Sequence, residues 1–152
     1  MITYKIIRNS LKYDIECNGE LLYTAIKKQK WLIRETTLML KRDNKNPVAI
    51  IIDDSFAFIQ FTRKIMFPDE GLECKIKNTF GVLYFSYKGS SYSIKYSLLS
   101  RHDGFFLNNI KAGEFEILET NYSKASFTIE SQSHELCFLF SLLQIANDNW
   151  AL

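Results

Sequence analysis

The residues that could do acid–base chemistry lie in two short motifs. His102 stands between Arg101 and Asp103, and a histidine beside a carboxylate can act as a general base. Neighbours in a sequence rarely face each other, so a turn is the simpler interpretation of this motif. His134-Glu135 begins like the helical zinc motif HExxH, but Phe138 stands where that motif needs its second histidine. We therefore predict no catalytic residue and no enzyme activity.

Metal and cofactor sites are equally hard to assemble from this sequence. The three cysteines, Cys17, Cys74 and Cys137, form no CxxC pair, and the chain has only two histidines. Asp53-Asp54 could bind a cation, but such a pair more often forms a turn. We expect reduced, buried thiols, no metal ion and no cofactor.

Basic residues gather in the first part of the chain. Residues 1–64 hold 12 Lys and Arg against 7 Asp and Glu, whereas the remainder holds 7 against 10. The densest group is Lys27, Lys28, Lys30, Trp31 and Arg34, which combines cations with an amphipathic aromatic ring. Near an anionic membrane each cation contributes about 1 kcal/mol, so this group is the candidate anion- or lipid-binding site. The alternative is that the lysines are solvated loop residues and that Trp31 belongs to the core.

Alternating polar and apolar residues predict an all-β body for these loops. Tyr13, Ile15 and Cys17 share one face of a strand, and Asn18-Gly19 after them is a strong hairpin signal because both residues tolerate positive φ. Residues 20–26 are the predicted return strand. Further strands are expected at 31–40, 48–52, 56–61, 72–77, 81–87, 92–98, 114–119 and 126–130, and turns at 43–47, 53–55, 67–71, 78 and 88–91. The total is about ten to twelve strands.

A single helix is expected near the end of the chain, at about residues 133–146. Residues 136–146 read LCFLFSLLQIA and are apolar nearly all round, whereas a surface helix would carry a polar face. Ser131 or Ser133 can cap its start, and Asn147-Asp148-Asn149 is the predicted end. The apolar run is shorter than the roughly 20 residues that a membrane span needs. We therefore predict a core helix that the strands enclose.

The size of a helix decides the architecture. A helix with its side chains is about 10 to 12 Å across, and an eight-stranded barrel has no room for it. A closed or nearly closed antiparallel barrel of about 12 strands can hold one helix. With 152 residues, the chain suits one domain of this kind, spanning residues 1–152.

This order of elements resembles the tubby-like superfamily, which includes the tubby proteins, the phospholipid scramblases and the LURP-one-related proteins, with uncharacterised bacterial members. The resemblance is carried by the hairpin at 13–23, the paired strands at 72–77 and 81–87, the stretch Gly113-Glu114-Phe115-Glu116-Ile117-Leu118, and the helix at 135–146. It implies a twelve-stranded barrel around a hydrophobic C-terminal helix. Tubby proteins bind phosphoinositide head groups through basic residues. No phosphoinositide motif can be placed on this sequence, so no binding residue is carried over.

The sequence favours a non-enzymatic binding or scaffold module that contacts anionic lipid or a protein partner through the basic early loops. The alternative is a small-molecule carrier or enzyme with a pocket between barrel wall and helix, although the helix fills the lumen that a carrier needs. Nucleic acid is not an expected partner, because the net charge is only +2 and the aromatic residues fall in strands. Charges at Lys5, Arg8 and Lys12 replace the apolar core of a signal peptide, so we expect a cytoplasmic monomer with no membrane span.

Overall fold

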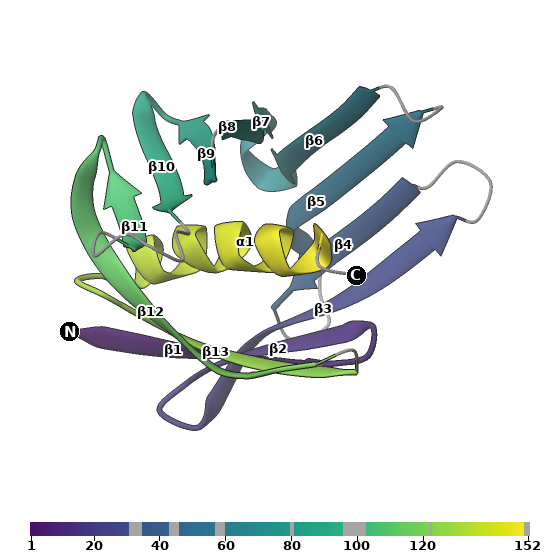
Figure 1. The fold of residues 1–152 in the computed structure, drawn as a ribbon. Helices are drawn as coiled ribbons and strands as arrows, with labels where there is room; N and C mark the ends of the chain where they lie inside the picture. Colours follow the sequence, from purple (N-terminus) through teal and green to yellow (C-terminus); the bar gives the residue numbers. More distant parts are fainter. Residues whose placement is uncertain are drawn as a thin grey trace.

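One antiparallel sheet of 13 strands wraps around one helix in the computed structural model of the protein (Figure 1). The structure describes residues 1–30, 35–42, 46–56, 60–79, 81–95, 103–121 and 123–150. The predicted fold class, a nearly closed barrel of about 12 strands around a C-terminal helix, is confirmed. In chain order the elements are β1 (Ile2–Asn9), β2 (Lys12–Cys17), β3 (Glu20–Lys30), β4 (Glu35–Lys41), β5 (Pro47–Phe56), β6 (Gln60–Phe67), the 3-10 helix η1 (Pro68–Glu70), β7 (Leu72–Lys75), β8 (Lys77–Thr79), β9 (Val82–Tyr87), β10 (Ser90–Lys95), β11 (Gly104–Leu107), β12 (Ile110–Thr120), β13 (Lys124–Ser131) and α1 (His134–Trp150).

The sheet is a meander whose two ends meet at one residue. Its strand order is β7-β6-β5-β4-β3-β2-β1-β13-β12-β11-β10-β9-β8, so β7 and β8 are the outermost strands. Only Ile76 separates them in the chain, and its amide donates a hydrogen bond to the carbonyl of Arg63 at 2.8 Å. The stretch 72–79 therefore pairs with β6 through its first half and with β9 through its second half, and in this way joins the two ends of the sheet.

The turn chemistry explains why the strands fold back where they do. Asn18 and Gly19 have φ of 52° and 79° between β2 and β3, which is the left-handed pair expected of a tight hairpin. Lys88 and Gly89 repeat this geometry between β9 and β10. The turn at Asn18-Gly19 is confirmed, as is the turn at 67–71, which contains η1. The turn predicted at 88–91 is shorter than expected and consists of Lys88-Gly89, because Ser90 and Ser91 already belong to β10.

Two turns predicted from acidic and amide residues are wrong. Asp53-Asp54-Ser55 lies inside β5, where Asp53 pairs across the sheet with Arg63 and its carboxylate lies 3.5 Å from the guanidinium Nε. The cross-strand cation compensates an aspartate that would otherwise be unfavourable in a strand. Asn78 lies in the middle of β8, opposite Leu83, with its side chain exposed. An exposed strand position tolerates an amide side chain.

The helix begins as predicted and ends later. Ser133 Oγ accepts a hydrogen bond from the amide of Leu136 at 3.2 Å, as an N-terminal cap does. The predicted end at 147–149 is wrong, because α1 continues to Trp150. Asp148 stays in the helix because its carboxylate pairs with Arg8 and Tyr13 inside the barrel. With Ser141 and Gln144 it forms a narrow polar stripe on a helix that is otherwise apolar and buried.

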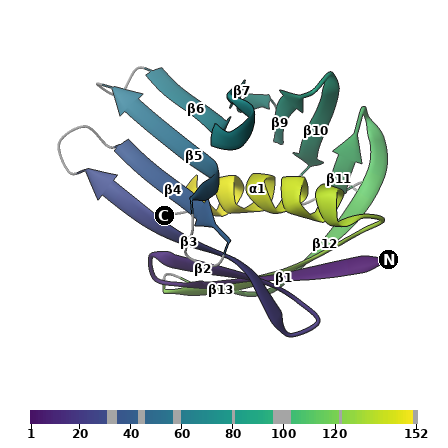
Figure 2. The same ribbon diagram turned by 180° about the vertical axis from the view of Figure 1, so that it is seen from behind.

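The core lies between α1 and the inner face of the sheet. Figures 1 and 2 show α1 with β1, β2 and β13 on one side and β5, β9 and β10 on the other. Residues 139–146 are each at most 1 % exposed, which confirms the predicted enclosure. The ring of Phe140 stacks on Phe105 with 4.7 Å between centroids and meets Tyr92 edge-on. Gly113 leaves room for that ring, because a Cβ there would lie 3.3 Å from Phe140 and 2.9 Å from the carbonyl of Glu130.

Candidate functional site

The structure divides the predicted basic group between the two faces of one strand. Lys27, Lys28 and Lys30 lie in β3 and not in a loop, because β3 runs four residues past the predicted end at residue 26. Successive side chains of a strand point to opposite faces. Lys27 is 3 % exposed and points into the barrel, whereas Lys28 is exposed on the outside. Lys30 is the last residue of β3, and Trp31 and Arg34 lie outside the described residues.

Inside the barrel, Lys27 belongs to an interior ionic cluster with Arg8, Tyr13 and Asp148. Arg8 Nε lies 2.9 Å from Asp148 Oδ2, and the two side chains are 2 % and 3 % exposed. The hydroxyl of Tyr13 donates a hydrogen bond to the same carboxylate oxygen. Arg8 also donates to the carbonyl of Asn121 at 2.8 Å. The cluster therefore ties the end of α1 to β1, to β2 and to the turn before β13.

Electrostatics inside the cluster follow from its burial. Desolvation lowers the pKa of Lys27, and the nearby Asp148 carboxylate acts in the opposite direction. Desolvation also raises the pKa of Tyr13, and the negative charge of Asp148 raises it further. The Asp148 carboxylate thus acts on both buried cations, and Asp53 adds a smaller effect on Lys27. We interpret the cluster as structural, because its hydrogen bonds link strands to the helix.

The remaining sequence motifs show no constellation for catalysis in the part of the chain that the structure describes. Arg101 and His102 lie outside that part, and Asp103 is half-buried just before β11. His134 Nδ1 lies 2.9 Å from the hydroxyl of Tyr4, at the start of α1. Among the described residues, no three His, Cys, Asp or Glu side chains gather as a metal site requires.

The outer face of β3 and β4 carries a more distinctive arrangement. Thr24, Ile26 and Lys28 of β3 and Met39 and Lys41 of β4 surround a shallow pocket of about 160 Å³, and we call these five residues the lysine patch. Ile26 pairs with Met39 across the two strands, and Thr24 pairs with Lys41. Ile26 is 57 % exposed, which is unusual for an isoleucine in the middle of a sheet.

The apolar part of the patch continues across the neighbouring strands. The register places Met39 opposite Ile50 of β5, and Ile50 opposite Met66 of β6. Burial alternates along these strands, and Ile50 and Met66 lie on the outer face with the patch. A second row beside it holds Lys28, Lys64 and Lys75. Lys64 forms an ion pair with Glu73 at 3.2 Å.

Only part of this surface could be found in the sequence. Lys28 is in the predicted basic group, but Ile26 and Met39 lie 13 residues apart in the sequence, so their contact depends on the β3–β4 register. The signal was the strand alternation itself, which places Ile26 and Lys28 on the same face. Without the register, the apolar row from Ile26 to Met66 has no signature in the sequence.

The protein should lose stability in alkaline solution, because its core buries a thiol and two phenols that must stay protonated there. Burial raises the pKa of the Cys137 thiol from 9.0 to about 11, and burial also raises the pKa of the phenols of Tyr4 and Tyr13. The folded state keeps these protons at pH values where the unfolded chain releases them, so their stabilising contribution is complete below about pH 9 and falls as the pH rises. Lys27 acts in the opposite direction, because its pKa is lowered, but three groups outweigh one.

Urea unfolding between about pH 8 and about pH 10.5 checks this expectation. The midpoint should fall steadily over this interval, and the fall should be smaller in the Tyr13→Phe variant, which has no phenol to ionise. A midpoint that stays constant or rises would contradict the assignment of these buried groups.

Comparison with known proteins places no relative beside this chain. No family model matches it, and neither a curated protein nor a solved structure does. In the described residues no helix has both the length and the apolar character to cross a bilayer. A functional assignment therefore has to come from the surfaces of the barrel itself.

Proposed function

We propose that this protein is a non-enzymatic binding module that lays the lysine patch on an anionic phospholipid surface. The observation that carries the proposal is the pairing of exposed Ile26 with Met39 between two lysines, Lys28 and Lys41, on one outer face. Peripheral membrane binding combines apolar side chains that enter the interface with cations that meet lipid phosphates. The lysine patch has both components within a single pair of strands.

Charge favours a lipid surface over a neutral partner. The described outer face of β2–β7 bears Lys12, Lys28, Lys41, Lys64 and Lys75 against Asp14, Glu16 and Glu73. Lysines near an anionic membrane contribute about 1 kcal/mol each, and this attraction acts in addition to burial of the apolar row. The cations therefore supply both affinity and the choice of an anionic surface.

The barrel around a hydrophobic C-terminal helix also supports the proposal that the protein is related to the tubby-like superfamily. We further propose that it is a cytoplasmic monomer. A carrier or enzyme with a pocket between the barrel wall and α1 has less support. Residues 139–146 of α1 are buried against the wall on every side. An outer surface is therefore the better place for a ligand.

Flotation with phosphatidylcholine vesicles, with and without phosphatidylserine, tests the proposal. The wild-type protein should float only with the anionic vesicles. Changing Lys28→Glu together with Lys41→Glu should weaken this binding at least about thirtyfold, because losing two cations already removes about 2 kcal/mol. The matched control is Lys5→Glu with Lys124→Glu, which changes the net charge equally on the exposed outer face of β1 and β13.

Two outcomes would reject the lipid assignment. One is wild-type protein that stays in the lipid-free bottom fraction with both lipid mixtures, which would leave the patch to a protein partner. The other is equal weakening in the patch variant and in the control variant, which would mean that net charge and not the lysine patch governs binding.

A further inference from the structure

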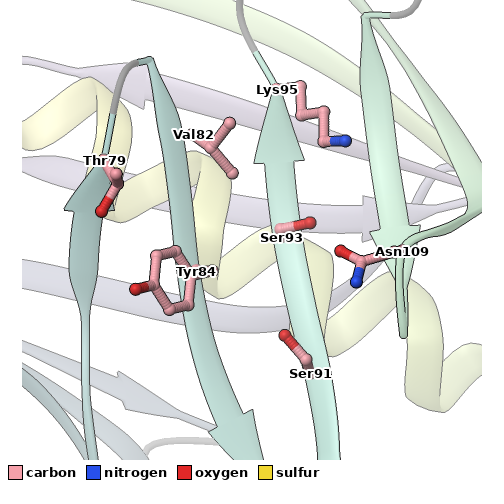
Figure 3. A pocket seen from close by; sticks show the side chains of 7 residues that line it. All are labelled: Thr79, Val82, Tyr84, Ser91, Ser93, Lys95 and Asn109. Atoms are coloured by element: carbon pink, nitrogen blue, oxygen red, sulfur yellow. The ribbon is translucent and has the colours of Figure 1, made fainter.

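A second hollow lies on the outer face of the opposite part of the barrel, over β8, β9 and β10 (Figure 3). Its volume is about 430 Å³, within the range of small-molecule sites. We call it the serine groove. Its lining consists of Thr79, Val82, Tyr84, Ser91, Ser93, Lys95 and Asn109.

The hollow exists because small side chains stand between large ones. Ser93 of β10 pairs with Tyr84 of β9 on one side and with Phe106 of β11 on the other. Ser91, two residues earlier, lies on the same face of β10. Ser93 thus lies between two aromatic residues, and Ser91 lies opposite Ser86, so small side chains leave a channel along the strand. Ser93 lies at its floor and is only 5 % exposed. Serine side chains are too short to fill the outer face of β10, so the space above them stays open.

The polar groups that line the groove have unused hydrogen-bonding capacity. Within the described part of the chain, the hydroxyls of Ser93 and Tyr84 and the side-chain amide of Asn109 make no hydrogen bond. Figure 3 shows Asn109 and Lys95 on the same side of β10 as the Ser93 hydroxyl. The Ser93 hydroxyl opens onto the groove, where a ligand or water that enters can complete its hydrogen bonds.

The cation at the end of the groove is held in place. Lys95 Nζ lies 4.4 Å from the centroid of the Phe106 ring, in cation–π geometry. Among the described residues Lys95 has no carboxylate partner within ion-pair distance. A positioned, uncompensated ammonium group attracts an anion, whereas a lysine that moves freely in solvent would not define a site.

From this arrangement we propose that the serine groove binds a small organic anion that carries several hydroxyl groups, such as a sugar phosphate or a sugar acid. Lys95 meets the anionic group. The hydroxyls of Thr79, Tyr84, Ser91 and Ser93 both donate and accept, and the Asn109 amide does the same, so together they match the hydroxyls of such a ligand. This site is independent of the lysine patch, because the two lie on different strands.

Titration of ¹⁵N-labelled protein with glucose 6-phosphate and with glucuronate, followed by amide chemical shifts, tests the proposal. At least one of these anions should cause saturable shifts confined to β8–β11. Glucose, which lacks the anion, and inorganic phosphate, which lacks the carbon hydroxyls, should each bind at least about tenfold more weakly. The variants Lys95→Gln and Ser93→Ala should lose affinity about tenfold and keep the dispersed spectrum of a folded barrel.

The control is Lys124→Gln, which removes an exposed lysine from β13 and should bind like wild type. Three results would each overturn the proposal. They are the absence of localised shifts with both anions, equal affinity for glucose and its 6-phosphate, and an unchanged affinity in Lys95→Gln. Shifts on β3 and β4 instead of β8–β11 would also overturn it, because they would place the anion on the lysine patch.

Discussion

Replacing Asp148 with alanine should lower the free energy of unfolding by about 3 to 5 kcal/mol. Its carboxylate lies 2.9 Å from the Arg8 guanidinium and accepts a hydrogen bond from Tyr13, and of the negative charges that act on buried Lys27 it has the largest effect. Without it, Arg8 and Lys27 remain inside the barrel without their main counter-charge. Since domains are stable by only about 5 to 15 kcal/mol, this loss is large.

A second substitution separates charge from packing in this prediction. Lys27→Met in the Asp148→Ala background removes one of the two cations that lost the Asp148 carboxylate and should recover part of the lost stability. Glu73→Ala is the surface comparison, because it breaks the exposed ion pair with Lys64 and should cost less than about 1 kcal/mol. Urea unfolding measures all three variants. Equal losses for Asp148→Ala and Glu73→Ala would show that the interior ionic cluster does not stabilise the fold as we infer.

Phe140→Ala should cost a similar amount, about 3 to 5 kcal/mol, through a different mechanism. Its ring is fully buried, stacks on Phe105 at 4.7 Å and meets Tyr92 at 6.2 Å, so its removal opens a cavity between α1 and the wall. The melting temperature should drop by roughly 6 to 20 °C for a chain of this length.

Phe138→Ala provides the internal comparison on the same helix. Phe138 is only half-buried and packs on Tyr23 with ring centroids 4.9 Å apart, so its truncation should cost clearly less than that of Phe140. Thermal unfolding of both variants measures the two losses, and the melting temperature of Phe140→Ala should be the lower one. If Phe138→Ala were the more damaging change, the helix would face the wall in another orientation.

The sequence contains most of the information for the fold. The hairpin at Asn18-Gly19, the cap at Ser133 and the apolar helix are local signals, and each one determines its element without knowledge of the rest of the chain. The barrel follows from them by size, because a helix that is apolar on all sides has to be enclosed. Local chemistry and global packing agree at these positions.

The candidate sites could be predicted less well, and the reason is physical. A lysine in a basic run is expected to be solvated unless a buried carboxylate lies near it, and the carboxylate that acts most strongly on Lys27 belongs to Asp148, at the far end of the sequence. Asp148 itself looked like a helix end, because aspartate usually stops or caps helices. The lysine patch and the serine groove depend on which residues stand opposite each other, and that register is a property of the folded sheet.

The join at Ile76 has a mechanical consequence for the barrel. Four residue pairs connect β7 to β6 and three connect β8 to β9, whereas β1 and β13 share eight. Among the described strands, β8 and β9 make fewer contacts with each other than any other neighbouring pair, so a lengthwise split of the wall breaks the fewest contacts there. An opening there would expose one side of α1 to water, while the long strands on the far side of the barrel keep their hydrogen bonds.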